Sequence, residues 1–135
     1  MIMKKTMLLV CFLLFGLAGS HLHAQMQPQS LKNTDWKTYI GDPLYDTLTL
    51  HIRTDSSFVT DKSGNTVVRS VCKVSADTLT LTDYDGQYAC PNATGKYKIS
   101  ITADAMLLTL IDDPCEGRGN SLNGIKWTKV VQKAP

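Results

Sequence analysis

Cysteine is the most reactive side chain in this chain, and its four copies lie in different settings. Cys11 lies inside an apolar N-terminal run, Cys72 lies in the middle of a Val-rich segment, and Cys90 and Cys115 each lie beside a proline in irregular segments. Two thiols of an exported protein are expected to pair in an oxidising compartment. We therefore predict a disulfide between Cys90 and Cys115. We expect Cys72 to be a buried free thiol, which behaves as a small hydrophobe.

Catalysis by Cys72 would need a basic partner that generates the thiolate. Beyond residue 24 the chain holds one histidine, His51, and the alternation of polarity places it on the wet face of its predicted strand. A phosphate loop, a nucleophile elbow and a metal-spaced His/Cys cluster are also absent from the sequence. We therefore predict a protein that is not an enzyme, with no catalytic residues, no metal site and no cofactor.

Two acidic segments have the side chains for cation binding or proton transfer. Residues 83–86, DYDG, begin like a calcium loop, but the glutamate at the twelfth position of such a loop is missing, so we predict a plain turn. Residues 112–118, DDPCEGR, place three acidic side chains beside Arg118. No histidine or second carboxylate cluster is near them in sequence, and we predict a turn with a local salt bridge, worth under about 1 kcal/mol if exposed.

The N-terminus has the order of a secretory signal. Lys4 and Lys5 precede an apolar run over residues 7–18, and small and polar residues follow. The run is too short to cross a bilayer as a helix. We predict cleavage after Ala24, with cleavage after Ser20 as the alternative, and expect an exported protein, periplasmic or secreted.

Removal of the predicted signal peptide, residues 1–24, changes the charge balance. It removes two of the 14 basic residues and none of the 12 acidic ones, so the formal charge falls from +2 to zero. Nucleic-acid binding usually requires a basic stripe, so we predict no nucleic-acid partner, and no second apolar segment predicts a membrane span. Residues 25–33 are polar and predict a flexible leader, and residues 34–135 predict one domain.

Strand-forming runs rich in Thr, Val, Ile, Leu and Tyr alternate with turn-forming clusters through this domain, and no stretch shows helical periodicity. Connections this short join only antiparallel neighbours, and closing the sheet removes its two edges. We therefore predict an all-β fold, an eight-stranded antiparallel up-and-down barrel, with a two-sheet sandwich as the alternative. The predicted strands are 34–41, 45–54, 56–61, 66–75, 77–83, 95–102, 105–112 and 125–132.

Period-2 alternation predicts which side chains point into the barrel. Aliphatic residues share one face of the second and sixth predicted strands, and the charges of the fourth turn Ser70 and Cys72 inward. The seventh strand is apolar on both faces and cannot be oriented. We predict that Trp36 and Trp127 come together, because the first and last strands of a closed barrel pair. The residues expected to line a ligand cavity are Leu48, Leu50, Ile52, Ser70, Tyr97, Ile99 and Ile101.

Two long segments carry a family resemblance: residues 77–97, DTLTLTDYDGQYACPNATGKY, and residues 107–127, LLTLIDDPCEGRGNSLNGIKW. Together with the early tryptophan in LKNTDWKTY, they resemble the lipocalin-like exported proteins of bacteria, which are small calycin-type barrels. The resemblance covers nearly all of the chain after the predicted signal. It implies an eight-stranded lipocalin-like barrel, a binding role and no cofactor.

These observations predict an extracytoplasmic binding protein that holds one small, mostly apolar ligand at the open end of the barrel. The alternative is a module with an extracellular protein partner, such as an inhibitor of an extracellular hydrolase. That function would use a filled barrel and the outer loops around Cys90 and Cys115. The interior of an eight-stranded barrel is just wide enough for side chains or for one small ligand, so the volume left inside distinguishes the two.

Overall fold

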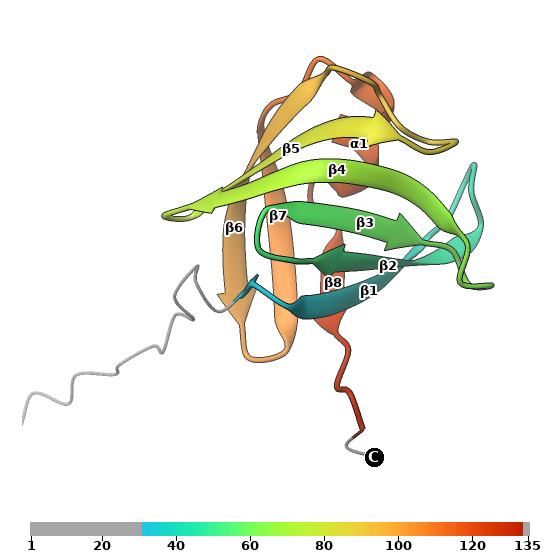
Figure 1. Cartoon of the computed structure of the whole chain (residues 1–135). Helices are drawn as coiled ribbons and strands as arrows, with labels where there is room; N and C mark the ends of the chain where they lie inside the picture. Colours follow the sequence, from blue (N-terminus) through green and yellow to red (C-terminus); the bar gives the residue numbers. More distant parts are fainter. Residues whose placement is uncertain (1–30, 134–135) are drawn as a thin grey trace, which may run out of the picture.

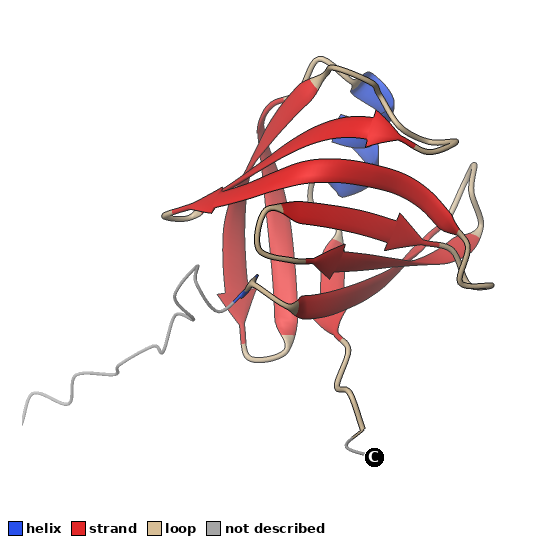
Figure 2. Cartoon of the chain, in the orientation of Figure 1, coloured by secondary structure: helices blue, strands red, loops and turns tan. Residues whose placement is uncertain are grey.

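The computed structural model describes residues 31–133, which form eight strands and one short helix (Figure 2). The predicted signal peptide and the first six residues of the predicted leader lie outside the described residues. The predicted strands agree with the observed ones to within a few residues at each end. The elements are β1 (Thr34–Ile40), β2 (Asp46–Ile52), β3 (Ser56–Thr60), β4 (Thr66–Ser75), β5 (Thr78–Asp85), β6 (Thr94–Thr102), β7 (Ala105–Asp112), α1 (Glu116–Leu122) and β8 (Lys126–Lys129).

The strands form one closed barrel in which each strand pairs antiparallel with its neighbours in sequence (Figure 1). The closure is made by β1 and β8, where Trp36 lies opposite Lys129 and Lys37 opposite Thr128. The backbone N–H of Val130 extends this seam by donating to the carbonyl of Asp35. The predicted up-and-down barrel is therefore confirmed, and the sandwich alternative is wrong.

The two ends of the barrel differ because successive connections of an up-and-down barrel lie at opposite ends. One end, the short-loop end, carries the tight connections β2–β3, β4–β5 and β6–β7. The other end, the long-loop end, carries the longer connections β1–β2, β3–β4 and β5–β6, together with the β7–β8 connection that contains α1 (Figure 1).

Toward the short-loop end the interior is filled by side chains. Leu31 belongs to this core and is fully buried, although the sequence placed it in the polar leader. Its hydrophobic side chain stabilises the barrel only if it is removed from water, which explains why this residue joins the fold. The fully buried apolar side chains here are Leu31, Trp36, Ile52, Leu79 and Met106.

The strand that the sequence could not orient, β7, turns Met106 and Leu108 inward and leaves Leu107 and Ile111 exposed. The two tryptophans both point into the barrel from the paired strands β1 and β8. They are not directly opposite each other: Trp36 pairs with Lys129, two residues after Trp127 along β8. Trp36 belongs to the packed core, and Trp127 reaches the hollow part of the interior.

Helix α1 is a difference from the sequence prediction, which contained no helix. Its seven residues include Gly117 and Gly119, and glycine is a weak helix former. Cys115 caps its N-terminus, with the sulfur accepting a hydrogen bond from the backbone N–H of Arg118. A Cβ at Gly119 would lie in ordinary van der Waals contact with Leu110 of β7, so this face of the helix packs on the strand. These tertiary ties, rather than sequence periodicity, hold the helix.

Candidate functional site

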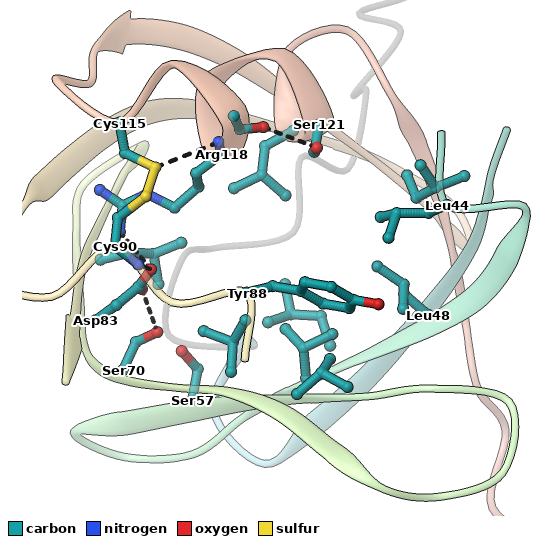
Figure 3. A pocket seen from close by; sticks show the side chains of 18 of the residues that line it. Leu44, Leu48, Ser57, Ser70, Asp83, Tyr88, Cys90, Cys115, Arg118 and Ser121 are labelled. Carbon is teal, nitrogen blue, oxygen red and sulfur yellow. Dashed lines mark hydrogen bonds and ion pairs between the residues drawn. A yellow bond between two sulfur atoms is a disulfide. The ribbon is translucent and has the colours of Figure 1, made fainter. Parts of the chain in front are cut away.

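A cavity of about 310 Å³ lies inside the barrel toward the long-loop end (Figure 3). Its wall is mostly aliphatic and comes from β2, β3, β4 and β5, while α1 borders it with Arg118, Ser121 and Leu122. Tyr88, from the β5–β6 connection, is half-exposed and extends across the cavity toward Leu48 (Figure 3). The aliphatic wall includes Leu48, Leu50, Val59, Val67, Val68 and Leu81.

The structure divides the predicted ligand-lining residues between the cavity and the packed core. Leu48, Leu50 and Ser70 line the cavity. The other four, Ile52, Tyr97, Ile99 and Ile101, belong to or pack against the core outside the cavity lining. Alternation along a strand predicts which face points inward. It does not predict how deep along the barrel a residue lies.

Two neighbouring valines of β4 reach the cavity together, which simple alternation forbids. The pairing of β3 with β4 shifts register at this point, with Val59 opposite Val68 but Thr60 opposite Thr66. The shift inserts Val67 as an extra residue, as in a β-bulge. Both Val67 and Val68 therefore line the cavity. The sequence offered no sign of this irregularity.

At one side of the cavity, Arg118 of α1 lies between two aspartates. Its Nε and Nη2 lie 2.7 and 2.8 Å from the two carboxylate oxygens of Asp113, which is a bidentate pair. Its Nη1 lies 2.9 Å from Oδ2 of Asp83, and Nη2 also donates to the carbonyl of Ala93. The three charged side chains are nearly fully buried, with at most 8% of any of them exposed.

The predicted disulfide between Cys90 and Cys115 is confirmed in the structure. It fixes the two backbone segments whose N–H groups bond the aspartates of this network. The N–H of Cys90 donates to Oδ2 of Asp83 at 3.0 Å, and the N–H of Cys115 donates to Oδ1 of Asp113 at 2.8 Å. Ser70 donates to the remaining oxygen of Asp83 at 2.7 Å (Figure 3). Each oxygen of both carboxylates thus accepts at least one hydrogen bond, as buried charges require. Nη1 of Arg118 is buried without a hydrogen bond among the described residues and is held by its ion pair with Asp83.

Tyr97 supports the same network from β6, because its hydroxyl donates to Oδ2 of Asp113. Burial and the neighbouring carboxylate raise the pKa of Tyr97, so the phenol stays neutral. Burial alone would raise the pKa of Asp113, but the hydrogen bonds from Arg118 and Tyr97 outweigh it and lower that pKa. Gly95 leaves the space for this carboxylate, since a Cβ there would collide with Asp113.

The network corrects two sequence predictions. Asp83 does not begin a turn: β5 continues to Asp85, and Asp83 is buried. The salt bridge in residues 112–118 is not an exposed local pair, because α1 folds Arg118 inward onto Asp83 as well as Asp113. The alternation of Leu79, Leu81 and Asp83 on one face of β5 was the signal that could have identified Asp83 as inward-facing.

The candidate catalytic groups lie apart. His51 hydrogen-bonds Asp35 and Thr60, its neighbours across the strands, on the outer face of the wall. Cys72 is buried on the inner side as a free thiol, as predicted. Desolvation raises the pKa of Cys72 to about 11, so it is protonated at neutral pH.

Within residues 31–133, no group of three or more His, Cys, Asp or Glu side chains is placed to hold a metal ion.

In the described part of the chain, no helix has the length and hydrophobicity needed to cross a membrane. Comparisons of this chain with protein-family models, with curated proteins and with solved structures find no match. The cavity and its bordering network are the structural features that bear on function.

Proposed function

We propose that this protein is an extracytoplasmic, lipocalin-like binding protein that holds one small, mostly apolar molecule in the cavity at the long-loop end. The observation that carries the proposal is the volume of about 310 Å³ left inside an eight-stranded barrel, behind a mostly aliphatic wall. Ligand sites of proteins start near this size and are lined mainly by apolar side chains with few polar groups. Burial of apolar ligand surface supplies the affinity, at about 25 cal/mol per Å².

A second hollow supports access to the cavity from outside. It lies between the β1–β2 connection and α1 and has a volume of about 370 Å³. The two hollows share the lining residues Ile40, Leu44, Gly117 and Ser121. A ligand that entered between the β1–β2 connection and α1 would meet this second hollow first. We propose this as the route into the barrel.

The cavity also bears on the choice between the two functions that the sequence left open. A protein-binding module needs no internal space, and we expected it to have a filled barrel. The remaining volume favours the small-molecule function. Export is supported by the disulfide, because such bonds persist mainly in oxidising compartments.

The test is a titration of the purified protein with N-phenyl-1-naphthylamine, an uncharged apolar dye whose fluorescence rises in a dry site. We expect saturable binding by the wild type. Val68→Phe places a ring in the cavity and should abolish or strongly weaken the binding. Val71→Phe is the matched control, because Val71 lies on the same strand with its side chain on the exposed outer face.

Circular dichroism and a urea melt should show that both variants are folded before their binding is compared. Equal weakening by the two variants, or unchanged binding by Val68→Phe, would place the dye outside the cavity. If the wild type binds no apolar probe at all, the small-molecule function is wrong and the protein-binding one takes its place.

A further inference from the structure

Building on the proposed function, we propose that the cavity selects a neutral amphiphile, meaning an apolar body that carries one uncharged hydrogen-bonding group such as a hydroxyl. The same cavity disfavours the corresponding carboxylate and ammonium compounds. Three features of its polar side carry this inference: an available hydroxyl, a buried guanidinium already paired with two carboxylates and a negative formal charge.

The available hydroxyl belongs to Ser57 of β3. Ser57 is 3% exposed and lines the cavity, where its hydroxyl lies beside that of Ser70 (Figure 3). The hydroxyl of Ser70, opposite Ser57 across the strands, is bonded to Asp83, and another polar neighbour of Ser57 is the thiol of Cys72, a weak partner. Because Ser57 lines the cavity, its hydroxyl can hydrogen-bond a ligand hydroxyl or carbonyl that reaches it.

The cation at the cavity is not available to a ligand. Nε and Nη2 of Arg118 donate to Asp113 and Ala93, and Nη1 is buried against Asp83 at 2.9 Å without a hydrogen bond of good geometry to any residue that the structure describes. A ligand carboxylate that reached this buried guanidinium would have to disturb its ion pairs. Breaking a buried ion pair leaves a charge uncompensated, which is strongly unfavourable.

The formal charge of the network is negative, because two carboxylates face one guanidinium. Among the residues that line the cavity, Asp83 and Arg118 are the charged ones. An anionic head group would therefore be desolvated near a net negative site without a free cation, and both effects oppose its binding.

An ammonium head group meets a different obstacle. One oxygen of Asp83 accepts from Ser70, and the other accepts from the N–H of Cys90 and lies against Arg118. Both oxygens of this carboxylate already accept a hydrogen bond, and its charge is paired with Arg118. An ammonium would therefore exchange its water for at most a shared acceptor, and burial of an incompletely paired ammonium is costly. A neutral hydroxyl avoids both penalties and still finds Ser57.

The volume sets the size of the ligand. A cavity of about 310 Å³ holds on the order of ten non-hydrogen atoms, if each occupies about the 30 Å³ that a water molecule has in the liquid. Ten-carbon chains with different head groups therefore form a matched set of probes: 1-decanol, decanoate and decylamine.

The test is displacement of N-phenyl-1-naphthylamine by these three compounds at about pH 7, where decanoate and decylamine are ionised. We expect 1-decanol to displace the dye at a concentration at least about 10-fold lower than either charged compound, which corresponds to about 1.4 kcal/mol. Ser57→Ala should weaken 1-decanol by about 2- to 10-fold, as expected for one neutral hydrogen bond. Ser100→Ala, on the outer face of β6, should change nothing.

The outcomes separate this inference from the proposed function. If the dye binds but decanoate or decylamine competes as well as 1-decanol, the neutral selectivity is wrong and the binding function stands. An unchanged affinity of Ser57→Ala for 1-decanol also overturns the inference. If neither the dye nor any of the three compounds binds, both proposals are wrong.

Discussion

The barrel carries two ion-pair clusters that differ in almost every respect, one beside the cavity and one on the outer wall. In the inner cluster a cation lies between two carboxylates, and in the outer cluster a carboxylate lies between two basic side chains. The inner cluster consists of Asp83, Asp113 and Arg118, and the outer cluster consists of Asp35, His51 and Arg53.

The outer cluster joins neighbouring strands. Oδ1 of Asp35 lies 2.9 Å from Nδ1 of His51 and 2.9 Å from Nη1 of Arg53. The His51 ring stacks on Phe58 with 4.3 Å between ring centroids, and its Nε2 lies 3.0 Å from the hydroxyl of Thr60. Water reaches this cluster, since 34% of the Arg53 side chain is exposed.

The difference shows how access to water sets the contribution of an ion pair to stability. Charges near water are screened, and losing one partner leaves the other solvated. Charges buried beside the cavity have no water to replace a lost partner, so each depends on all the others. The inner cluster should therefore control both the fold of the long-loop end and the chemistry of the cavity, and the outer cluster should control neither.

The largest contrast is expected from removing one arginine of each cluster. Arg118→Met leaves two buried carboxylates without their cation and should cost about 3–5 kcal/mol of unfolding free energy. Arg53→Met removes a partly exposed partner and should cost about 1 kcal/mol or less. Urea unfolding of both variants measures the difference. Similar losses would show that burial does not separate the clusters.

Removing the disulfide tests whether the backbone on either side of the inner cluster must be held in place. Cys90 and Cys115 are separated by 25 residues, and the chain-entropy model values such a cross-link at about 3.5 kcal/mol. The double variant Cys90→Ala/Cys115→Ala should lose about this much in a urea melt. Cys72→Ala is the control; it removes a buried thiol but no cross-link, at a cost of about 1 kcal/mol. A double variant as stable as this control would contradict the anchoring role.

Smaller effects should follow from the hydroxyls that support each cluster. Tyr97→Phe removes the hydrogen bond to the buried Asp113 and should cost about 1.5–3 kcal/mol, the range for bonds to charged groups. Thr60→Val removes the bond to the partly exposed His51 and keeps the shape, so we expect about 0.5 kcal/mol. Thermal and urea unfolding should rank the two variants in this order, and the reverse order would contradict the comparison.

The smallest effect concerns pH and salt. Burial alone would raise the pKa values of Asp113 and Asp35, but hydrogen bonds from Arg118 and Arg53, respectively, lower both. A lowered pKa stabilises the fold above the unfolded-state value, near 4, and this stabilisation is lost as the pH falls through the folded-state value. Stability should therefore decline below about pH 4.

Salt distinguishes the two contributions to this decline. At about 1 M NaCl the effect of Asp35→Asn on unfolding free energy should shrink, because its partner Arg53 is partly exposed and therefore screened by salt, and that of Asp113→Asn should persist. Urea melts between about pH 3 and pH 7 check both statements. A flat pH profile would contradict the first, and equal salt sensitivity would contradict the second.

Much of the barrel was predictable from local patterns. Alternation identified the strands and the inward residues Leu48 and Leu50, because one face of each strand is dry and the other is wet. The disulfide was predictable because Cys90 and Cys115 lie in irregular segments while Cys72 lies mid-strand. These properties depend on near neighbours in sequence.

The site itself was less predictable because it depends on distant contacts. The turn-like composition of residues 83–86 hid the inward position of Asp83, although its parity with Leu81 indicated it. Helix α1 contains two glycines and no hydrophobic period, so neither the helix nor the inward turn of Arg118 could be foreseen. Nothing local predicts whether space remains inside a barrel after its side chains are placed.

The most direct test of the account is to map where an apolar molecule binds, using methyl NMR of the protein during titration with 1-decanol. We predict that the methyl signals of Leu48, Val68 and Leu81 shift, since these residues line the cavity. The signals of Leu79 in the packed core and of Val71 on the outer face should stay in place. Shifts confined to the outer face, or no shifts at saturating ligand, would contradict a binding cavity inside this barrel.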